Sequence, residues 1–346
     1  MSHQYRAIGW NPHKRAYDVA AVTVALTLML AVAGGTAWRT PWVTAETLVL
    51  RATGVTALLL LHAILSIGPL CRLDHRLLPL LYNRRHLGVL TFLVAATHGV
   101  LAIVQFHAGG DLHPLVSLLT SSTGWFTVSR FPFHVPGALA LSILFVMAAT
   151  SHDFWLRTLT APVWKTLHMG VYLAYFSLVL HVSFGALQSE APAWVAGLLA
   201  AGVVWLATLH LLAGRVESHA DQPARAVPGA PWVDAGPVEG IPNRRARIVC
   251  AAGERIAVFR YDGKVSAVSN VCQHQNGPLG EGKIVGGCIV CPWHGYEYAP
   301  DTGAAPPPFT EAVPTFRVAV MDGRVYVDPR PLPPGSRVRP AECPSC

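Results

Sequence analysis

Two short segments near the C-terminal end of the chain each pair a cysteine with a histidine. Cys272 is followed by His274 and Cys291 by His294, with sixteen residues between the two pairs. Each pair is followed within a few residues by a glycine, which favours a turn. Thiolates and imidazoles are common protein ligands of zinc and of iron centres. Two such loops held side by side would present four ligands to one metal centre.

Two kinds of centre fit this set of ligands. A structural zinc site takes two cysteines and two histidines, but its motifs usually pair like ligands, as in C-x-x-C followed by two histidines. Here each segment contributes one cysteine and one histidine. That mixed pairing is typical of a [2Fe-2S] cluster in which two cysteines hold one iron and two histidines hold the other. The spacing therefore favours the cluster, with zinc as the alternative.

Residues 231–330 resemble a Rieske domain, and CPWHG at residues 291–295 is close to the ferredoxin-type version of its motif. The resemblance implies a small all-β fold that binds a [2Fe-2S] cluster. It implies four ligands, which are the thiolates of Cys272 and Cys291 and the imidazoles of His274 and His294.

Two positions depart from the high-potential members of that family. Those members carry a disulfide between the two loops and a serine that hydrogen-bonds a cluster sulfur. Asn276 and Gly277 stand where the first extra cysteine would fall, and Tyr296 replaces the serine. Fewer hydrogen bonds to sulfur leave the oxidised cluster relatively more stable. We therefore expect a potential near the low end of the Rieske range, about −150 mV. The missing disulfide also fits a reducing cytoplasm.

Other cysteines near this region do not match the ligand spacing. Cys250 and Cys288 are expected to be buried small hydrophobic residues, as free cysteines often are. Cys343-Pro-Ser-Cys346 is a single C-x-x-C motif on a tail that we expect to be mobile. Without a second pair, this motif is weak support for a metal site.

The composition of the whole chain indicates a membrane protein. Hydrophobic residues make up 52% of the 346 residues, and charged residues make up 13%. A spanning helix needs about 20 mostly apolar residues. Six segments satisfy this requirement, and we place them near residues 18–38, 52–70, 88–106, 132–150, 166–186 and 193–213. The basic residues flank these segments and form no aromatic-interleaved stripe, which argues against nucleic-acid binding.

The basic residues are unevenly distributed between the two sides of the predicted bundle. Ten lie in the termini and connections of one side, namely Arg6, Lys14, Arg15, Arg72, Arg76, Arg84, Arg85, Arg157, Lys165 and Arg215. Three lie on the other, namely Arg39, Arg51 and Arg130. The positive-inside rule then predicts that both termini are cytoplasmic in the cell inner (plasma) membrane. A cleaved signal peptide at the first span is the alternative, which would move the C-terminal domain outside.

The chain is thus predicted to have five parts. They are a cytoplasmic N-terminal tail (1–17), a six-helix transmembrane haem-binding domain (18–213), a linker (214–230), a Rieske [2Fe-2S] domain (231–330) and a proline-rich tail (331–346). In the β domain, Asp262-Gly263 and Asp322-Gly323 separate short β-branched runs and predict hairpin turns. The fold class is an α-helical membrane bundle followed by a small all-β domain.

Several histidines lie at membrane depth, where ionisable residues are usually functional. His168 and His181 are thirteen residues apart in one span, which separates them by roughly 20 Å along a helix. His86 and His98 lie twelve residues apart in a span of the same direction. This arrangement predicts two levels of iron ligands, one haem near each face. If His86 is not a ligand, His62 is the next candidate for the inner haem.

Residues 84–98, RRHLGVLTFLVAATH, and residues 149–181 resemble the ferric reductase-like transmembrane family, which includes the haem subunit of the methionine sulfoxide reductase system. The resemblance implies b-type haem bound by His98, His168 and His181. His86 is a departure, because that haem subunit does not characteristically have histidine there. Arg84 and Arg85 could pair with haem propionates, although anchoring at the membrane interface is the simpler role.

Flavin and nicotinamide domains follow the haem domain in ferric reductases, yet no G-x-G-x-x-G motif is found here. We therefore predict a transmembrane electron conduit. Electrons would pass from a cytoplasmic flavoprotein or ferredoxin to the cluster, then to haem, then to a quinone, ferric iron or a periplasmic acceptor. One alternative is a membrane-anchored redox sensor or assembly factor without haem. The other is a quinol-oxidising module with electrons flowing inward.

Overall fold

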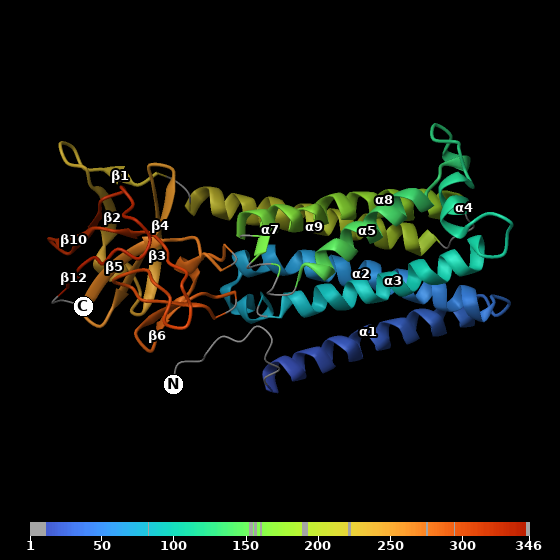
Figure 1. The fold of residues 1–346 in the computed structure, drawn as a ribbon, viewed down its shortest axis with the longest axis horizontal. Helices are drawn as coiled ribbons and strands as arrows, with labels where there is room; N and C mark the ends of the chain where they lie inside the picture. The colour runs from blue at the N-terminus through green and yellow to red at the C-terminus, as the bar shows by residue number, and fades with distance from the viewer. Residues whose placement is uncertain are drawn as a thin grey trace. The chain divides into compact units, whose positions relative to one another are not determined.

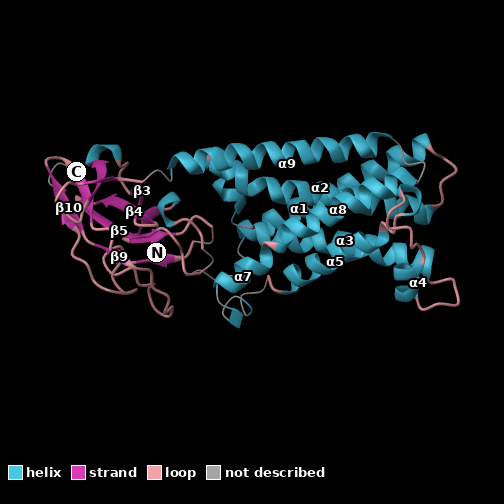
Figure 2. Cartoon of the chain, turned by 90° about the horizontal axis from the view of Figure 1, so that it is seen from above, coloured by secondary structure: helices cyan, strands magenta, loops and turns pink. Residues whose placement is uncertain are grey.

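The computed structural model describes residues 12–81, 83–151, 155, 158–159, 161–188, 193–220, 223–274, 276–293 and 295–343. The chain divides into two compact units. The helical unit comprises residues 8–70 and 83–211, and the other comprises residues 1–7, 71–82 and 212–346. Helices and strands are segregated along the chain (Figures 1 and 2).

The described helices of the first two-thirds of the chain are mostly long and apolar. They are α1 (Pro12–Arg39), α2 (Ala45–Leu73), α3 (Arg84–His107), α4 (Pro114–Thr120), α5 (His134–Ala149), α7 (Ala161–His168), α8 (Gly170–Gln188) and α9 (Ala193–Ala220), with 3-10 turns η1 (His75–Leu81) and η2 (Val128–Arg130). Five stretches in them are long and apolar enough to cross a membrane, namely Arg15–Arg39, Ala45–Leu73, Arg84–His107, Val163–Gly185 and Trp194–Ser218. The chain is therefore a multi-pass membrane protein.

The predicted count of six spans exceeds these five long helices by one. The segment predicted at 132–150 contains α5, which has only 16 residues. At 1.5 Å per residue it is about 24 Å long, shorter than the hydrocarbon core of about 30 Å. The predicted segment extends beyond this helix at both ends, since α5 begins at His134 and ends at Ala149.

The helical unit packs α5 against α8 and α3, and α3 also contacts α1 and α4. Figure 1 shows α2, α3, α5 and α8 running alongside one another. The starts of α3 and α8 lie at one end of this bundle, and α4 lies at the other, so we call these the Arg84 end and the α4 end. Matching residues on α3 and α8 can therefore lie at similar depth.

The C-terminal part of the chain forms three small antiparallel sheets. Its strands are β1 (Arg225–Ala226), β2 (Val233–Pro237), β3 (Arg245–Ala251), β4 (Glu254–Tyr261), β5 (Lys264–Ser269), β6 (Lys283–Val285), β7 (Cys288–Val290), β8 (Glu297–Tyr298), β9 (Thr315–Phe316), β10 (Val318–Met321), β11 (Arg324–Val327) and β12 (Ala341–Glu342). The sheet orders are β1-β2-β11-β10, β12-β5-β4-β3 with β9 on β5, and β6-β7-β8.

The predicted hairpin turns are confirmed. Asp262 and Gly263 have φ values of 44° and 70°, and Asp322 and Gly323 have values of 49° and 71°. Positive φ at both central residues is what a two-residue type I′ turn requires, and Asp-Gly meets it with little strain. These turns connect β4 to β5 and β10 to β11.

Two hydrophobic cores stabilise the β domain. One lies among β2, β3, β4, β5 and β11 and includes Ile256, Val258, Val265, Phe316 and Val325. The other lies beneath the two cysteine-histidine segments and includes Phe259, Cys272, Leu279, Ile289, Cys291, Tyr296 and Tyr298. The second core therefore fixes the candidate metal ligands by burial.

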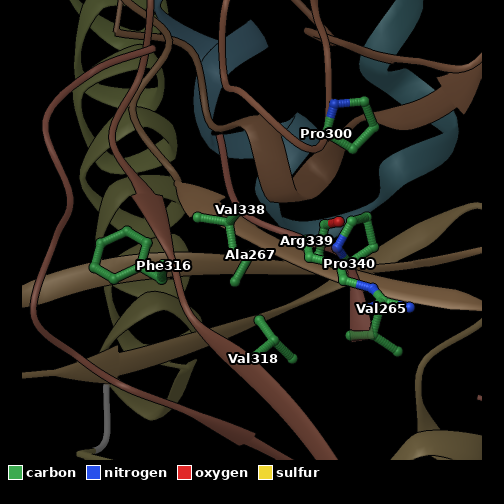
Figure 3. A pocket seen from close by; sticks show the side chains of 9 residues that line it. Val265, Ala267, Pro300, Phe316, Val318, Val338, Arg339 and Pro340 are labelled. Atoms are coloured by element: carbon green, nitrogen blue, oxygen red, sulfur yellow. The ribbon is translucent and has the colours of Figure 1, made fainter. Parts of the chain in front are cut away.

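The segment after residue 330 packs on the β domain. The Val338 N–H donates to the Asp301 carbonyl at 2.7 Å, and β12 pairs with β5. A small surface pocket lies where Val338 and Pro340 approach Phe316 (Figure 3). Its lining is largely apolar and includes none of the predicted cluster ligands.

The other cysteines differ from expectation. Cys250 and Cys288 are only half-buried, because their strands β3 and β7 leave part of each side chain accessible. Cys343 is buried in the first core and disulfide-bonded, so the tail is ordered up to this residue rather than mobile. Cys346 lies outside the described residues.

Candidate iron-sulfur and haem sites

The first ligand loop, residues 272–277, follows β5. The Cys272 N–H donates to the Gly277 carbonyl at 2.9 Å, and the Asn276 N–H donates to the Cys272 carbonyl at 2.7 Å. Asn276 has a φ of 56°, in the left-handed region that asparagine enters more readily than most residues. These bonds close the loop, with Cys272 buried and His274 only 9% exposed.

The second ligand loop, residues 291–296, connects β7 to β8 and repeats this backbone pattern. The Cys291 N–H donates to the Tyr296 carbonyl at 2.8 Å, and the Gly295 N–H donates to the Cys291 carbonyl at 2.9 Å. Gly295 has a φ of 71° and occupies the position of Asn276 in the first loop. His294 lies outside the described residues. The structure thus describes Cys272, His274 and Cys291 of the four predicted ligands.

The two loops approach each other closely. A Cβ atom at Gly277 would lie 2.7 Å from the Cys291 Sγ and 3.2 Å from the Trp293 ring. Only glycine fits at that position, because real Cβ atoms do not come within 3.0 Å of another heavy atom. Cys272 and Cys291 also share one buried core. Two thiolates and an imidazole on paired loops fit a [2Fe-2S] centre with mixed ligation.

Tyr298 is a candidate site residue that was not predicted from the sequence. Its hydroxyl lies 3.4 Å from the Cys272 Sγ and accepts from the Gln273 N–H at 3.1 Å. Burial, with the neighbouring Cys272 thiolate, raises the pKa of Tyr298 above its ordinary range. The hydroxyl therefore stays protonated and donates to sulfur. The second tyrosine of CPWHGYEY was the available signal, and it supplies a sulfur hydrogen bond that the expectation of a low potential did not include.

Tyr296 occupies the position expected to lack a hydrogen bond to sulfur. Its ring stacks on His274 with centroids 4.9 Å apart and planes at 7°. Its hydroxyl donates to a Glu311 carboxylate oxygen. The side chain is 2% exposed, so both contacts are inside the protein.

His98 of α3 and His181 of α8 lie together in the helical unit. Their ring centroids are 6.2 Å apart and their planes meet at 75°. Nδ1 of His98 donates to the Leu50 carbonyl at 3.0 Å, and Nδ1 of His181 donates to the Phe133 carbonyl at 2.8 Å. These bonds leave each Nε2 as the lone-pair nitrogen. Two imidazoles that bind one metal at about 2 Å can have ring centroids about 6 Å apart, so His98 and His181 would be able to hold one haem iron.

Two glycines make room for these rings. A Cβ atom at Gly54 of α2 would lie 2.9 Å from the His98 ring, and one at Gly137 of α5 would lie 2.6 Å from Nδ1 of His181. Neighbouring helices therefore contact both imidazoles on the side of the Nδ1 atoms. This packing fixes the ring orientations that a ligand needs.

His168 is placed at the end of α7, toward the Arg84 end. Its Nδ1 donates to the Trp164 carbonyl at 3.0 Å, and its ring stacks on the Trp164 ring with centroids 3.7 Å apart. Its Nε2 is buried and makes no hydrogen bond within the described parts of the chain. A buried imidazole nitrogen without a hydrogen-bond partner is available to bind a metal ion.

The two predicted partners of His168 differ in which ring nitrogens are occupied. Nδ1 of His86 donates to the Asp18 carboxylate of α1 at 2.8 Å. His62 donates from Nδ1 to the Leu58 carbonyl at 2.8 Å and accepts from the Tyr175 hydroxyl at Nε2, 3.0 Å away. Both ring nitrogens of His62 are therefore occupied, whereas the Asp18 contact leaves Nε2 of His86 as the lone-pair nitrogen, as at His98 and His181.

Two protein families match successive parts of the chain. The family described as Ferric reductase like transmembrane component matches residues 52–179, and the Rieske [2Fe-2S] domain family matches residues 231–317. The predicted order of the two domains is thus confirmed. His98 and His168 fall inside the first match, and His181 lies two residues beyond its end.

The relatives match the C-terminal domain. The ferredoxin subunit of 3-phenylpropionate/cinnamic acid dioxygenase from Photorhabdus laumondii is 37% identical over 26% of this chain and 87% of its own length. A probable 3-ketosteroid-9-alpha-monooxygenase oxygenase component from Rhodococcus rhodochrous is 29% identical over 33% of this chain, which spans 31% of that relative's length. The solved ferredoxin of Sphingomonas yanoikuyae B1 is 30% identical over 28% of this chain and 98% of its own, with a TM-score of 0.27.

Proposed function

This chain belongs to the Rieske [2Fe-2S] family and carries a ferric reductase like transmembrane component ahead of that domain, and we propose that it transfers electrons between a [2Fe-2S] cluster and b-type haem in a membrane. The cluster and the haem supply one-electron redox chemistry when bound. The protein supplies ligands, orientation and surroundings. Cys272, His274, Cys291 and His294 hold the cluster, and His98 and His181 hold one haem.

The proposed setting is the cell inner membrane, with both termini and the Rieske domain in the cytoplasm. The excess of basic residues in one set of connections supports this orientation. The electron donor is then a cytoplasmic flavoprotein or ferredoxin. The acceptor is a quinone, ferric iron or a periplasmic protein, reached from the α4 end of the bundle.

The observation that carries the proposal is the pairing of His98 with His181. A helical anchor that served only to tether a Rieske domain has no need of two imidazoles at 6.2 Å in apolar surroundings. Each ring is also oriented by a backbone carbonyl from another element, Leu50 in α2 and Phe133 before α5. A metal-bound histidine usually donates its other ring N–H to an acceptor of this kind, which fixes the orientation of the ring.

A second haem is proposed at the level of His168. Support comes from its buried Nε2 and from the starts of α3 and α8, which lie at the same end of the bundle (Figure 1). His86 is its proposed partner, since the Asp18 carboxylate binds its Nδ1 and leaves Nε2 as the lone-pair nitrogen. Replacing either histidine with alanine should therefore lower the haem content.

The test is spectroscopy of the purified full-length protein. Reduced haem is measured by its α-band, and the cluster by EPR and by iron and sulfide content. His98→Ala and His181→Ala should each lower haem content with an intact cluster signal. His210→Ala is the matched control, because its Nδ1 donates to the Leu206 carbonyl and its Nε2 contacts the Tyr172 hydroxyl. Full haem content in both ligand variants would remove the assignment, and a wild-type protein without haem would favour the anchor.

The direction of electron flow needs a separate measurement. Anaerobic mixing with a reduced flavoprotein or ferredoxin should change the cluster absorbance before the haem absorbance. Haem that changes first after addition of a quinol would instead support inward flow.

A further inference from the structure

Tyr296 contacts both ligand loops of the cluster site. Its carbonyl accepts the Cys291 N–H at 2.8 Å within the second loop. Its ring lies parallel to the ring of His274, a ligand from the first loop, at a centroid distance of 4.9 Å. Phe309 packs on the same tyrosine at 5.0 Å. The side chain can therefore transmit a constraint from the segment around residue 310 to a metal ligand.

Glu311 is the residue that the Tyr296 hydroxyl contacts. The hydroxyl and the Thr310 N–H both donate to its Oε2, the latter at 3.1 Å. Burial favours the neutral acid, but the hydrogen bond from Tyr296 and those from the Glu311 and Thr310 backbone together outweigh it and hold the pKa of Glu311 below its ordinary value. A carboxylate is thus fixed behind the tyrosine that stacks on His274.

We infer that Glu311 lowers the reduction potential of the cluster and that Tyr296 positions the His274 ring. Reduction adds an electron to the cluster, and a fixed negative charge nearby disfavours that addition. The stacked ring limits rotation of His274 about its side-chain bonds. The purely structural alternative is that the Tyr296–Glu311 bond only fastens the segment 306–311 to the domain. The inference rests on the cluster of the proposed function and is independent of haem.

The effect of the charge is measured by an EPR-monitored redox titration of the full-length protein. Glu311→Gln keeps a hydrogen-bond acceptor and removes the charge. We expect the ratio of reduced to oxidised cluster at a fixed ambient potential to rise about tenfold, which is about 59 mV for one electron. Glu311→Asp should titrate close to wild type. Glu254→Gln is the control, an exposed acid at the start of β4. A Glu311→Gln titration that overlays the control would overturn the charge effect.

The positioning role is tested by a pair of variants at residue 296. Tyr296→Phe keeps the stack on His274 and should keep the EPR g-values of wild type. Tyr296→Leu removes the stack and should change those g-values and speed loss of the cluster. Identical spectra from the two variants would reject the positioning role, even if Glu311→Gln failed to assemble a cluster. Absence of iron and sulfide from the wild-type protein would instead reject the proposed function itself.

Discussion

The iron-sulfur loops and the haem histidines hold their ligands in different ways. In the loops, the ligands fall within one short stretch, and each loop is closed by hydrogen bonds of its own backbone, as between Cys272 and Gly277. In the bundle, His98 and His181 come from helices far apart in the sequence, and each is oriented by a carbonyl from a third element. The first site depends on local turns, and the second depends on helix packing. A substitution that disrupts one site should therefore leave the other site intact.

The largest expected effect comes from breaking the contact between the two ligand loops. Gly277→Ala places a Cβ atom 2.7 Å from the Cys291 Sγ. We expect loss of most of the cluster, because the thiolate must move away from its partner loop, while haem content stays at the wild-type level. Iron, sulfide and visible absorbance of the purified protein measure this. Gly214→Ala, with no atom within 4 Å of the added Cβ, is the control. A fully loaded Gly277→Ala cluster would show that the loops are more pliable than proposed.

The converse experiment targets the bundle. Gly137→Ala places a Cβ atom 2.6 Å from Nδ1 of His181, so the ring must shift from the Phe133 carbonyl. We expect partial loss of haem with a full cluster signal. Alanine favours helix over glycine by about 1 kcal/mol, so a weaker helix cannot be the cause. Gly197→Ala in α9, which has open space around it, should retain haem. If the cluster content decreased together with the haem content, the two sites would not be independent.

The same contrast explains what could be predicted from the sequence. Cys272, His274 and Cys291 could be predicted as ligands because their spacing is a local sequence motif. The depths of His98 and His181 can be predicted from the rise per residue of a helix. The contact of His86 with Asp18 cannot, because Asp18 lies on another helix and the contact depends on how the two helices pack. Tyr298 was missed because its reach to Cys272 depends on the pairing of β7 with β8. The sixth span stays a prediction, because α5 is apolar but has only 16 residues, and hydropathy alone does not place its start.

A smaller effect is expected from the sulfur hydrogen bond within the loops. Tyr298→Phe removes the hydroxyl that lies 3.4 Å from the Cys272 Sγ. Hydrogen bonds to sulfur stabilise the more negative, reduced cluster, so the potential should fall. A bond worth about 1 kcal/mol corresponds to a few tens of millivolts for one electron. The shift should be opposite in sign to that of Glu311→Gln. An unchanged potential would mean that the hydroxyl does not act on the cluster.

The smallest effect tests a part of the β domain remote from either metal site. Asp328 is 2% exposed and pairs with Arg330 at 2.7 Å. The Arg330 hydrogen bond holds the pKa of Asp328 below its ordinary value of 3.8. A carboxyl whose pKa is depressed by folding stabilises the folded state above its unfolded pKa, and this contribution is lost as the pH falls through the folded pKa. Asp328→Asn should thus lower stability at pH 7 by about 1 kcal/mol, since the partner arginine is largely solvated.

The wild-type and Asp328→Asn proteins should converge as the pH falls below about 4, where the aspartate of the unfolded chain is protonated. Thermal loss of cluster absorbance, recorded from pH 7 to well below pH 4, follows the β domain without reference to the bundle. Glu254→Gln provides the comparison, since that acid is exposed and remote from Arg330 in the sequence. A gap between wild type and variant that widened toward acid pH would assign the effect to a group other than Asp328. A haem spectrum that stayed constant through the same transition would show that the helical unit holds its histidines without help from the β domain.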